Sequence, residues 1–261
     1  MIYEKTRTLL WFAKRPSHWA HAFALAQRKF LTDHDTPDLR GKARRWAEEN
    51  AVTVDAALSK LELHGRVDDI DPALFSEARA RASEARTVMG GAGDLRLLFN
   101  TVRLSGASRV LETGVAYGWS SLAILSAFQG RRNARLVSVD MPYPKLGNEE
   151  DVGIVVPERL QENWTLVRKP DRNGILEAIS ELGGQIDLCH YDSDKSWWGR
   201  HYAFPVLWNS LKAGGVFISD DIQDNLYFSE FARRVAVPFA VTECEGKFVG
   251  IMRKPPLVGR V

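Results

Sequence analysis

The chain has 261 residues, of which 45% are hydrophobic and 26% charged, and its formal net charge at pH 7 is +2. This composition is typical of a globular protein with one α/β domain and an added subdomain, and the small net charge gives no reason to expect a nucleic-acid partner. No apolar run approaches the roughly 20 residues needed to cross a bilayer, and we find no secretory signal.

The chain contains two cysteines, Cys189 and Cys244, which are too few for a disulfide framework. Both lie in apolar stretches that are predicted to be strands. We therefore expect small buried side chains in a reducing compartment, which predicts a cytoplasmic protein.

Residues 1–105 show helical periodicity and almost no β-branched runs, which predicts an N-terminal helical extension. Ten Lys and Arg but only four Asp and Glu fall within residues 1–45. The extension is expected to pack on the rest of the chain or on a second copy in a homodimer, with peripheral membrane contact as the second interpretation. Its first helix is indicated by Trp19, Phe23, Ala26 and Phe30 after a start at Pro16, and further helices are predicted over 39–49, 53–63, 71–86 and 94–103.

Residues 106–261 show a different pattern, in which short apolar strands alternate with helices. Strands are predicted over 109–112, 136–140, 164–168, 186–191 and 216–219, and helices over 119–128, 173–182, 198–211 and 225–235. This alternation predicts a mostly parallel sheet covered on both faces, as in a Rossmann-like α/β fold. The last two strands, 237–242 and 247–252, are joined by four residues and predict an antiparallel C-terminal hairpin.

A glycine-containing turn follows the first of these strands. Gly114 and Gly118 allow the backbone to turn tightly and approach a ligand, and the next helix offers its free amides there. Asp140 ends the following strand, where a carboxylate can accept hydrogen bonds from ribose hydroxyls. The spacing, E-x-G-x-x-x-G starting at Glu112, differs from the G-x-G-x-x-G of dinucleotide-binding turns. A plain strand-to-helix turn is the alternative.

Acidic residues follow two later strands. Asp192 comes after strand 186–191, and Asp220 and Asp221 come after strand 216–219. If these strands are neighbours, about 4.8 Å apart, the three carboxylates lie close together and repel one another. A divalent cation such as Mg²⁺, which prefers oxygen ligands, would relieve this repulsion. Alternatively, the acids cap helices or bind backbone amides without a metal.

The run from Glu112 to Ser120 resembles motif I of class I S-adenosylmethionine-dependent methyltransferases. The resemblance covers about residues 85–235. Over this range the chain is similar to the small-molecule O-methyltransferases that include the catechol and macrocin enzymes. Its further landmarks are Leu97, Leu98, Arg103, Val155, Val156, Pro157, Glu158, Arg159, Leu160, Trp164, Gly214 and Gly215.

This resemblance implies a cofactor site for S-adenosylmethionine. Asp140 would bind the ribose, and Asp171 would contact the adenine unless it only caps the helix over 173–182. The residues implied around the methionine part are Glu112, Gly114, Gly118 and Ser120.

The same resemblance implies that Asp192, Asp220 and Asp221 bind Mg²⁺, which holds the acceptor hydroxyl. Lys195 stands three residues after Asp192, at the spacing of the proton-accepting lysine in the catechol enzymes. We expect its pKa to be lowered toward neutrality, as a base requires, unless the lysine only pairs with a carboxylate. Asp192 and His201 are the alternative bases. This chain departs from the common Asp-Gly-Asp-His pattern, with Asp-Ser-Asp-Lys from Asp192 onward.

Two tryptophans, Trp197 and Trp198, follow this cluster and line either an acceptor pocket or the buried face of a helix. The sequence thus predicts a metal-assisted O-methyltransferase that acts on a hydroxyl of a small molecule or a sugar. The alternatives are a metal-independent methyltransferase acting on nitrogen or a macromolecule, and a cofactor-binding scaffold without catalysis.

Overall fold

The computed structural model describes residues 8, 10–28, 34–142 and 149–256. Its centre is a seven-stranded sheet in the order β3-β2-β1-β4-β5-β7-β6, in which β1 to β5 are parallel and β7 runs antiparallel to both its neighbours. The predicted α/β sheet with a C-terminal antiparallel pair is therefore confirmed. The strands are β1 (Arg109–Thr113), β2 (Arg135–Val139), β3 (Trp164–Val167), β4 (Ile186–Tyr191), β5 (Leu211–Ser219), β6 (Phe239–Cys244) and β7 (Lys247–Arg253).

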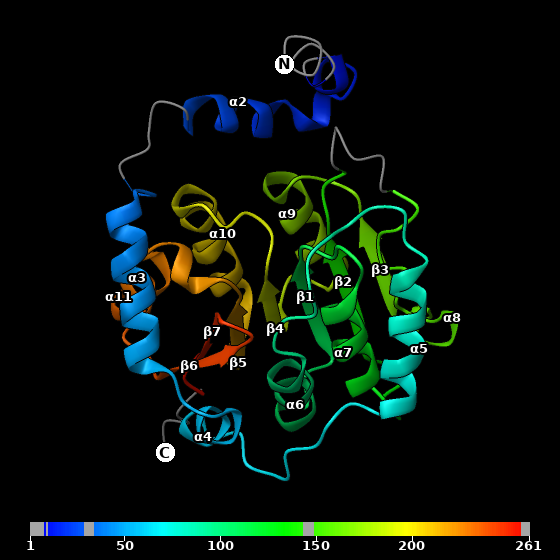
Figure 1. The fold of residues 1–261 in the computed structure, drawn as a ribbon, viewed down its shortest axis with the longest axis vertical. Coiled ribbons are helices and arrows are strands. Elements are labelled where there is room, and N and C mark those ends of the chain that lie inside the picture. Colours follow the sequence, from blue (N-terminus) through cyan, green and yellow to red (C-terminus); the bar gives the residue numbers. More distant parts are fainter. Residues whose placement is uncertain (1–7, 9, 29–33, 143–148, 257–261) are drawn as a thin grey trace.

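Helices cover both faces of the sheet, because successive strand residues point to opposite sides. On β1, Val110 belongs to one hydrophobic core and Leu111 to the other. The first face is covered by α4 (Val54–Lys60), α5 (Pro72–Ser83), α6 (Leu95–Ser105) and α7 (Trp119–Ala127), and the second by α3 (Pro37–Asn50), α9 (Asp171–Glu181), α10 (Trp197–Ser210) and α11 (Tyr227–Val235) (Figure 1).

Local sequence accounts for where several elements end. Asp94 begins α6 by accepting a hydrogen bond from Leu97 N at 2.9 Å, and Gly106 ends it in a left-handed conformation. The β6–β7 turn consists of Glu245 and Gly246, both with positive φ, which is the backbone that joins tight hairpins.

The extent of β5 differs from the prediction. It begins at Leu211 rather than Val216, because Leu211 already pairs with Ile186 of β4 before the register shifts. Gly214, with a φ of 76°, lies inside this irregular part of the strand.

The N-terminal segment crosses one end of the molecule. It contains a short 3-10 helix, η1 (Pro16–His18), and α2 (Trp19–Arg28), which lies over α9 and α10 (Figure 1). This confirms the predicted helix, whose Phe30 lies outside the described residues. The other short elements are α8 (Glu158–Gln161) and η2 (Ile222–Asp224). No helix within the described ranges is long and apolar enough to span a membrane.

Candidate active site

The candidate site lies where the strand order changes direction, between β1 and β4. The chain leaves these neighbouring strands toward opposite faces, which opens a crevice at their carboxyl ends. Gly114, with a φ of 79°, turns the chain after β1 so closely that an added Cβ would lie 2.4 Å from the carbonyl oxygen of Asp192. Gly118, with a φ of 91°, would similarly bring a Cβ within 2.9 Å of Gly153 Cα. Both glycines therefore shape the crevice through the backbone.

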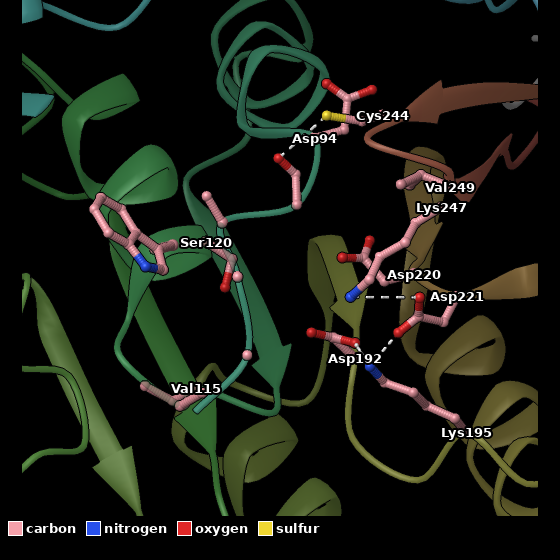
Figure 2. Close-up of a pocket in the computed structure, with 16 residues that line it drawn as sticks. Asp94, Val115, Ser120, Asp192, Lys195, Asp220, Asp221, Cys244, Lys247 and Val249 are labelled. Carbon is pink, nitrogen blue, oxygen red and sulfur yellow. Dashed lines mark hydrogen bonds and ion pairs between the residues drawn. The ribbon is translucent and has the colours of Figure 1, made fainter. Parts of the chain in front are cut away.

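Charged side chains line a cavity in this crevice (Figure 2). They carry four carboxylates and two ammonium groups, a net charge of −2 when all are ionised. The structure brings together the predicted Ser120, Asp192, Lys195, Asp220 and Asp221, and adds Asp94, Cys244 and Lys247, which sequence reasoning missed. Cys244 is half-buried in the wall of this cavity, whereas Cys189 is fully buried as expected.

Lys195 points between two of the predicted metal ligands. Its Nζ lies 3.0 Å from Asp192 Oδ1 and forms a second ion pair with Asp221 (Figure 2). Burial lowers the pKa of Lys195, but the two carboxylates raise it, and the net direction is upward. The expectation of a lowered pKa is therefore wrong for this arrangement, because the acids stabilise the ammonium.

Among the carboxylates that line this cavity, Asp192 has a pKa raised to a value that suits proton transfer near neutral pH. Burial, aided by the negative charge of Asp220, raises the pKa of Asp192 to about 6, against the opposing effects of Lys195 and His190. A group with this pKa is ionised at pH 7 and can still accept a proton, as a general base requires.

The predicted metal ligands meet the chemical requirement for Mg²⁺ but are not arranged around a common point. Asp192 and Asp221 pair with Lys195, while Asp220 Oδ1 lies 3.2 Å from His190 Nε2. Among the side chains that the structure describes, no three His, Cys, Asp or Glu residues form a group suited to holding a metal ion.

Three interacting charged side chains, those of Glu112, His190 and Asp220, lie beneath the candidate site. His190 on β4 is 2% exposed, and its two ring nitrogens lie 3.6 Å from Glu112 Oε1 and 3.2 Å from Asp220 Oδ1. Burial lowers the pKa of His190, but the two carboxylates raise it to about 10, so the ring is protonated. Sequence reasoning passed over His190, although a histidine inside an apolar strand was the available signal.

Glu112 faces this interior rather than the cavity. Its Oε2 accepts hydrogen bonds from Ser121 Oγ at 2.5 Å and from Ser138 Oγ at 2.6 Å. The carboxylate thus joins β1, β2 and α7 beneath the glycine turn.

Arg200 fixes the two acids after β5. Its guanidinium is fully buried and donates to the carbonyl oxygens of Asp220 and Asp221, at 3.0 and 2.7 Å, and to Asn225 Oδ1 at 3.1 Å. Asp221 has a φ of 51°, a conformation uncommon outside glycine. The bonds from Arg200 hold the backbone in this turn.

The two acids predicted to bind the nucleoside lie near the cavity but outside its lining. Asp140 Oδ1 accepts a hydrogen bond from Val115 N at 3.0 Å, and Oδ2 pairs with Arg168. Burial raises the pKa of Asp140 despite these partners. The Asp140 carboxylate therefore holds the glycine turn through Val115 and forms an ion pair with Arg168.

Asp171 is the first residue of α9, after an N-cap at Pro170 that makes no side-chain cap bond. It accepts a hydrogen bond from Ser193 Oγ at 2.6 Å, and burial raises its pKa to about 6. The cap interpretation of Asp171 is therefore wrong, and its carboxylate instead holds the loop after β4.

The N-terminal extension reaches this same loop. Asp35 Oδ1 accepts hydrogen bonds from Trp197 N at 3.0 Å and from Asn225 Nδ2 at 3.1 Å, and His34 stacks on Trp197 with ring centres 3.9 Å apart. The extension thus anchors the start of α10, directly after Lys195.

The aromatic residues after the acids do not line the cavity of Lys195. Trp197 packs edge-on against Tyr227, and His201 stacks on Trp197. His201 and Trp198 line a second cavity, between α2, α9 and α10. The alternative base His201 is thus placed apart from the charged cluster.

Residues 111–222 match the model of a methyltransferase domain family. No significant match was found among curated proteins. An O-methyltransferase from Bacillus cereus in complex with S-adenosylhomocysteine has a similar fold, with a TM-score of 0.52 and 16% identity over 80% of this chain and 100% of that one. TomG, an O-methyltransferase from Streptomyces achromogenes involved in tomaymycin synthesis and solved with S-adenosylmethionine, gives 0.53 and 19% over 80% and 98%. Cofactor-bound Rv0187 from MTB gives 0.55 and 18% over 71% and 91%.

Proposed function

We propose that this chain, which carries a methyltransferase domain with the class I fold, transfers the methyl group of S-adenosylmethionine to a hydroxyl oxygen of a small molecule or sugar. One observation carries the proposal. The glycine turn after β1 and the acids after β4 and β5 meet around one cavity with a net negative charge. A sulfonium methyl donor is a cation, so this charge favours its binding.

The nucleoside part of the cofactor would lie on the β1–β2 side of the crevice. We assign the ribose hydroxyls to Asp140, where they replace or share the bond with Arg168. Asp171 and the loop that it holds would border the adenine. Ser120, at the start of α7, lines the cavity for the methionine part, while Gly114 and Gly118 shape the turn.

Glu112 would act indirectly in this scheme. Its carboxylate is already bound by Ser121 and Ser138, so it positions the turn rather than contacting the cofactor.

Methyl transfer requires the acceptor oxygen, the methyl carbon and the sulfur to lie in line. The new bond forms between oxygen and carbon, the carbon–sulfur bond breaks, and S-adenosylhomocysteine leaves. We assign the hydroxyl proton to the carboxylate of Asp192, whose raised pKa suits this task. Without a bound cation, Lys195, held as an ammonium, would orient Asp192 and Asp221. The sequence predicts Lys195 as the base and Asp192 as an alternative, whereas here Asp192 is assigned as the base.

We further propose that a divalent cation such as Mg²⁺ assists the reaction through Asp192, Asp220 and Asp221. The support is the chemistry of the donors, three carboxylates at one edge of the sheet, and the net charge of the cavity. When bound, the ion would supply positive charge to the acceptor oxygen. Lys195 would have to leave the space between Asp192 and Asp221, which makes metal binding compete with its two ion pairs.

The proposal also covers the N-terminal extension, the oligomeric state and the cellular location. We take residues 1–105 as an extension of a cofactor-binding domain at 106–261, and we propose that the extension also joins two copies in a homodimer. Trp19 and Phe23 on α2 are 56% and 66% exposed, so α2 offers an apolar surface for this contact.

The unpaired Cys189 and Cys244 support a cytoplasmic location.

The proposed reaction is tested with S-adenosylmethionine that carries a ¹³C methyl group. The protein is incubated with catechols, simple phenols and free sugars, and the product methyl is identified by NMR. A new O-methyl signal supports the proposal. An N-methyl product from amine-bearing compounds in the same panel would favour the nitrogen methyltransferase, and cofactor binding without turnover of any class would favour the scaffold.

A further inference from the structure

The second cavity, between α2, α9 and α10, lies apart from the proposed methyl-transfer site. It has a volume of about 400 Å³, which is within the size range of small-molecule sites. None of its lining residues lines the cavity of Lys195. It is lined by Ala24, Arg28, Arg172, Trp198, His201, Tyr202 and Pro205.

Two arginines give this cavity a positive character. Arg28 pairs with Asp194, but its Nε is buried without a hydrogen-bond partner. Arg172 stacks over the ring of Tyr202, with its guanidinium carbon 4.4 Å from the ring centre. Within the part of the chain that the structure describes, Arg172 forms no ion pair with a carboxylate. The Arg172 guanidinium is therefore available to an anion, and Arg28, already paired with Asp194, adds positive charge beside it.

Burial and nearby positive charges lower the pKa values of two histidines beside the cavity. Burial lowers the pKa of His21, and Arg28 and Arg172 lower it further, against the opposing effect of Asp194. Burial and the charge of Arg234 lower the pKa of His201. Both rings are therefore neutral near pH 7, and the arginines remain the cationic groups of the cavity.

Flat rings form the rest of its wall. Trp198 and Tyr202 line the cavity, and His201 beside them is edge-on to Trp198 with ring centres 5.6 Å apart. Aromatic faces and a stacked guanidinium favour a planar ligand, because flat rings pack against both.

We propose that this cavity binds a small organic anion with a planar ring, whose acidic group pairs with Arg172 in the positive field that Arg28 adds, and whose ring packs against Trp198 and Tyr202. A carboxylate is the acidic group that a planar guanidinium binds most directly, through two parallel hydrogen bonds. The site is independent of the proposed methyl transfer. Arg28 also joins the cavity to the loop after β4, through Asp194.

The test uses benzoate as the probe, with benzamide as the uncharged match and cyclohexanecarboxylate as the non-planar match. The full chain is labelled with 5-fluorotryptophan, and Trp198→Phe identifies the ¹⁹F signal of Trp198. Benzoate at millimolar concentration is expected to shift that signal in a saturable manner. Benzamide and cyclohexanecarboxylate are expected to bind more weakly, because each lacks one of the two features that the cavity recognises.

Arg172→Gln is expected to weaken benzoate binding about tenfold, the usual effect of losing a charged hydrogen-bond donor. Arg172→Lys, which keeps the charge, should lose less, and Arg79→Gln, an exposed arginine on α5, should bind as the native chain does. An unchanged ¹⁹F spectrum of the ligand-free variant shows that the fold is intact. Equal binding of benzoate and benzamide, no response of Trp198, or full affinity in Arg172→Gln would overturn the proposal.

Discussion

Replacing His190 by glutamine tests the interactions of His190 with Glu112 and Asp220 beneath the candidate site. The substitution keeps a polar side chain on β4 but removes the positive charge between Glu112 and Asp220. The buried carboxylate of Glu112 and the partly buried carboxylate of Asp220 would then lack their common cation. Breaking a buried ion pair in this way typically costs about 3–5 kcal/mol, so His190→Gln should be strongly destabilised at pH 7.

The pH dependence of this effect follows from the pKa of His190. The folded chain holds the proton with a pKa of about 10, against 6.5 for an ordinary histidine. The stabilisation is therefore fully present below pH 6.5 and is lost as the pH rises through 10. Each unit of pKa corresponds to about 1.4 kcal/mol, so the whole effect is on the order of 5 kcal/mol. Between pH 7 and pH 9 this group alone should reduce the free energy of unfolding by up to about 3 kcal/mol.

Urea unfolding at pH 6, 7, 8 and 9 measures this difference. The native chain should lose stability over this range, and His190→Gln should lose much less, so the gap between them narrows as the pH rises. His64→Gln is the matched control, since His64 is exposed. A gap that is the same at pH 6 and pH 9 would refute a protonated His190.

Three further outcomes are expected. Asp192→Asn should lower turnover by roughly 10²–10⁴-fold, and kcat/KM of the native enzyme should fall as the pH drops below about 6, because the base is then protonated; a profile that is flat down to pH 5 would exclude Asp192 as the base. A chelator should abolish methyl transfer but leave the affinity for S-adenosylhomocysteine nearly unchanged; full activity in excess chelator would contradict the proposed metal site. The turnover of Lys195→Met compared with that of Asp192→Asn shows which side chain takes the proton. Trp19→Ser with Phe23→Ser should convert a dimer into monomers in light scattering, with Leu176→Ser as the exposed control on α9; a native chain that is already monomeric would contradict the proposed contact.

Much of the fold followed from local patterns in the sequence. The alternation of apolar strands and helices after Ser108 predicted the parallel sheet, and the short Glu243–Gly246 connection predicted the hairpin. These features depend on residues close together in the chain. The early start of β5 was missed, because its pairing with Ile186 depends on a neighbouring strand.

The candidate site was predicted in composition but not in contacts. The sequence placed Asp192, Asp220 and Asp221 at one edge of the sheet, and the structure brings them to one cavity. It did not reveal that Lys195 pairs with two of them, since side-chain direction depends on the tertiary structure. The pKa expected for Lys195 was wrong for the same reason.

The contributions of distant segments were also missed. Asp94 and Lys247 reach the cavity from α6 and β7, and Asp35 anchors α10 from the N-terminal extension. No local motif marks these residues, because their roles arise only when segments far apart in the sequence pack together.

The affinity for S-adenosylhomocysteine, measured by calorimetry, tests the central claim most directly. We expect the native chain to bind it, and Asp140→Ala to weaken binding by about 1–3 kcal/mol through the loss of charged hydrogen bonds to the ribose. Asp140→Asn should lose less, because its amide oxygen can still accept a hydrogen bond from Val115 N. Asp69→Ala, at an exposed position, should bind as the native chain does. Absence of binding to the native chain, or an unchanged affinity in Asp140→Ala, would contradict the proposed cofactor site.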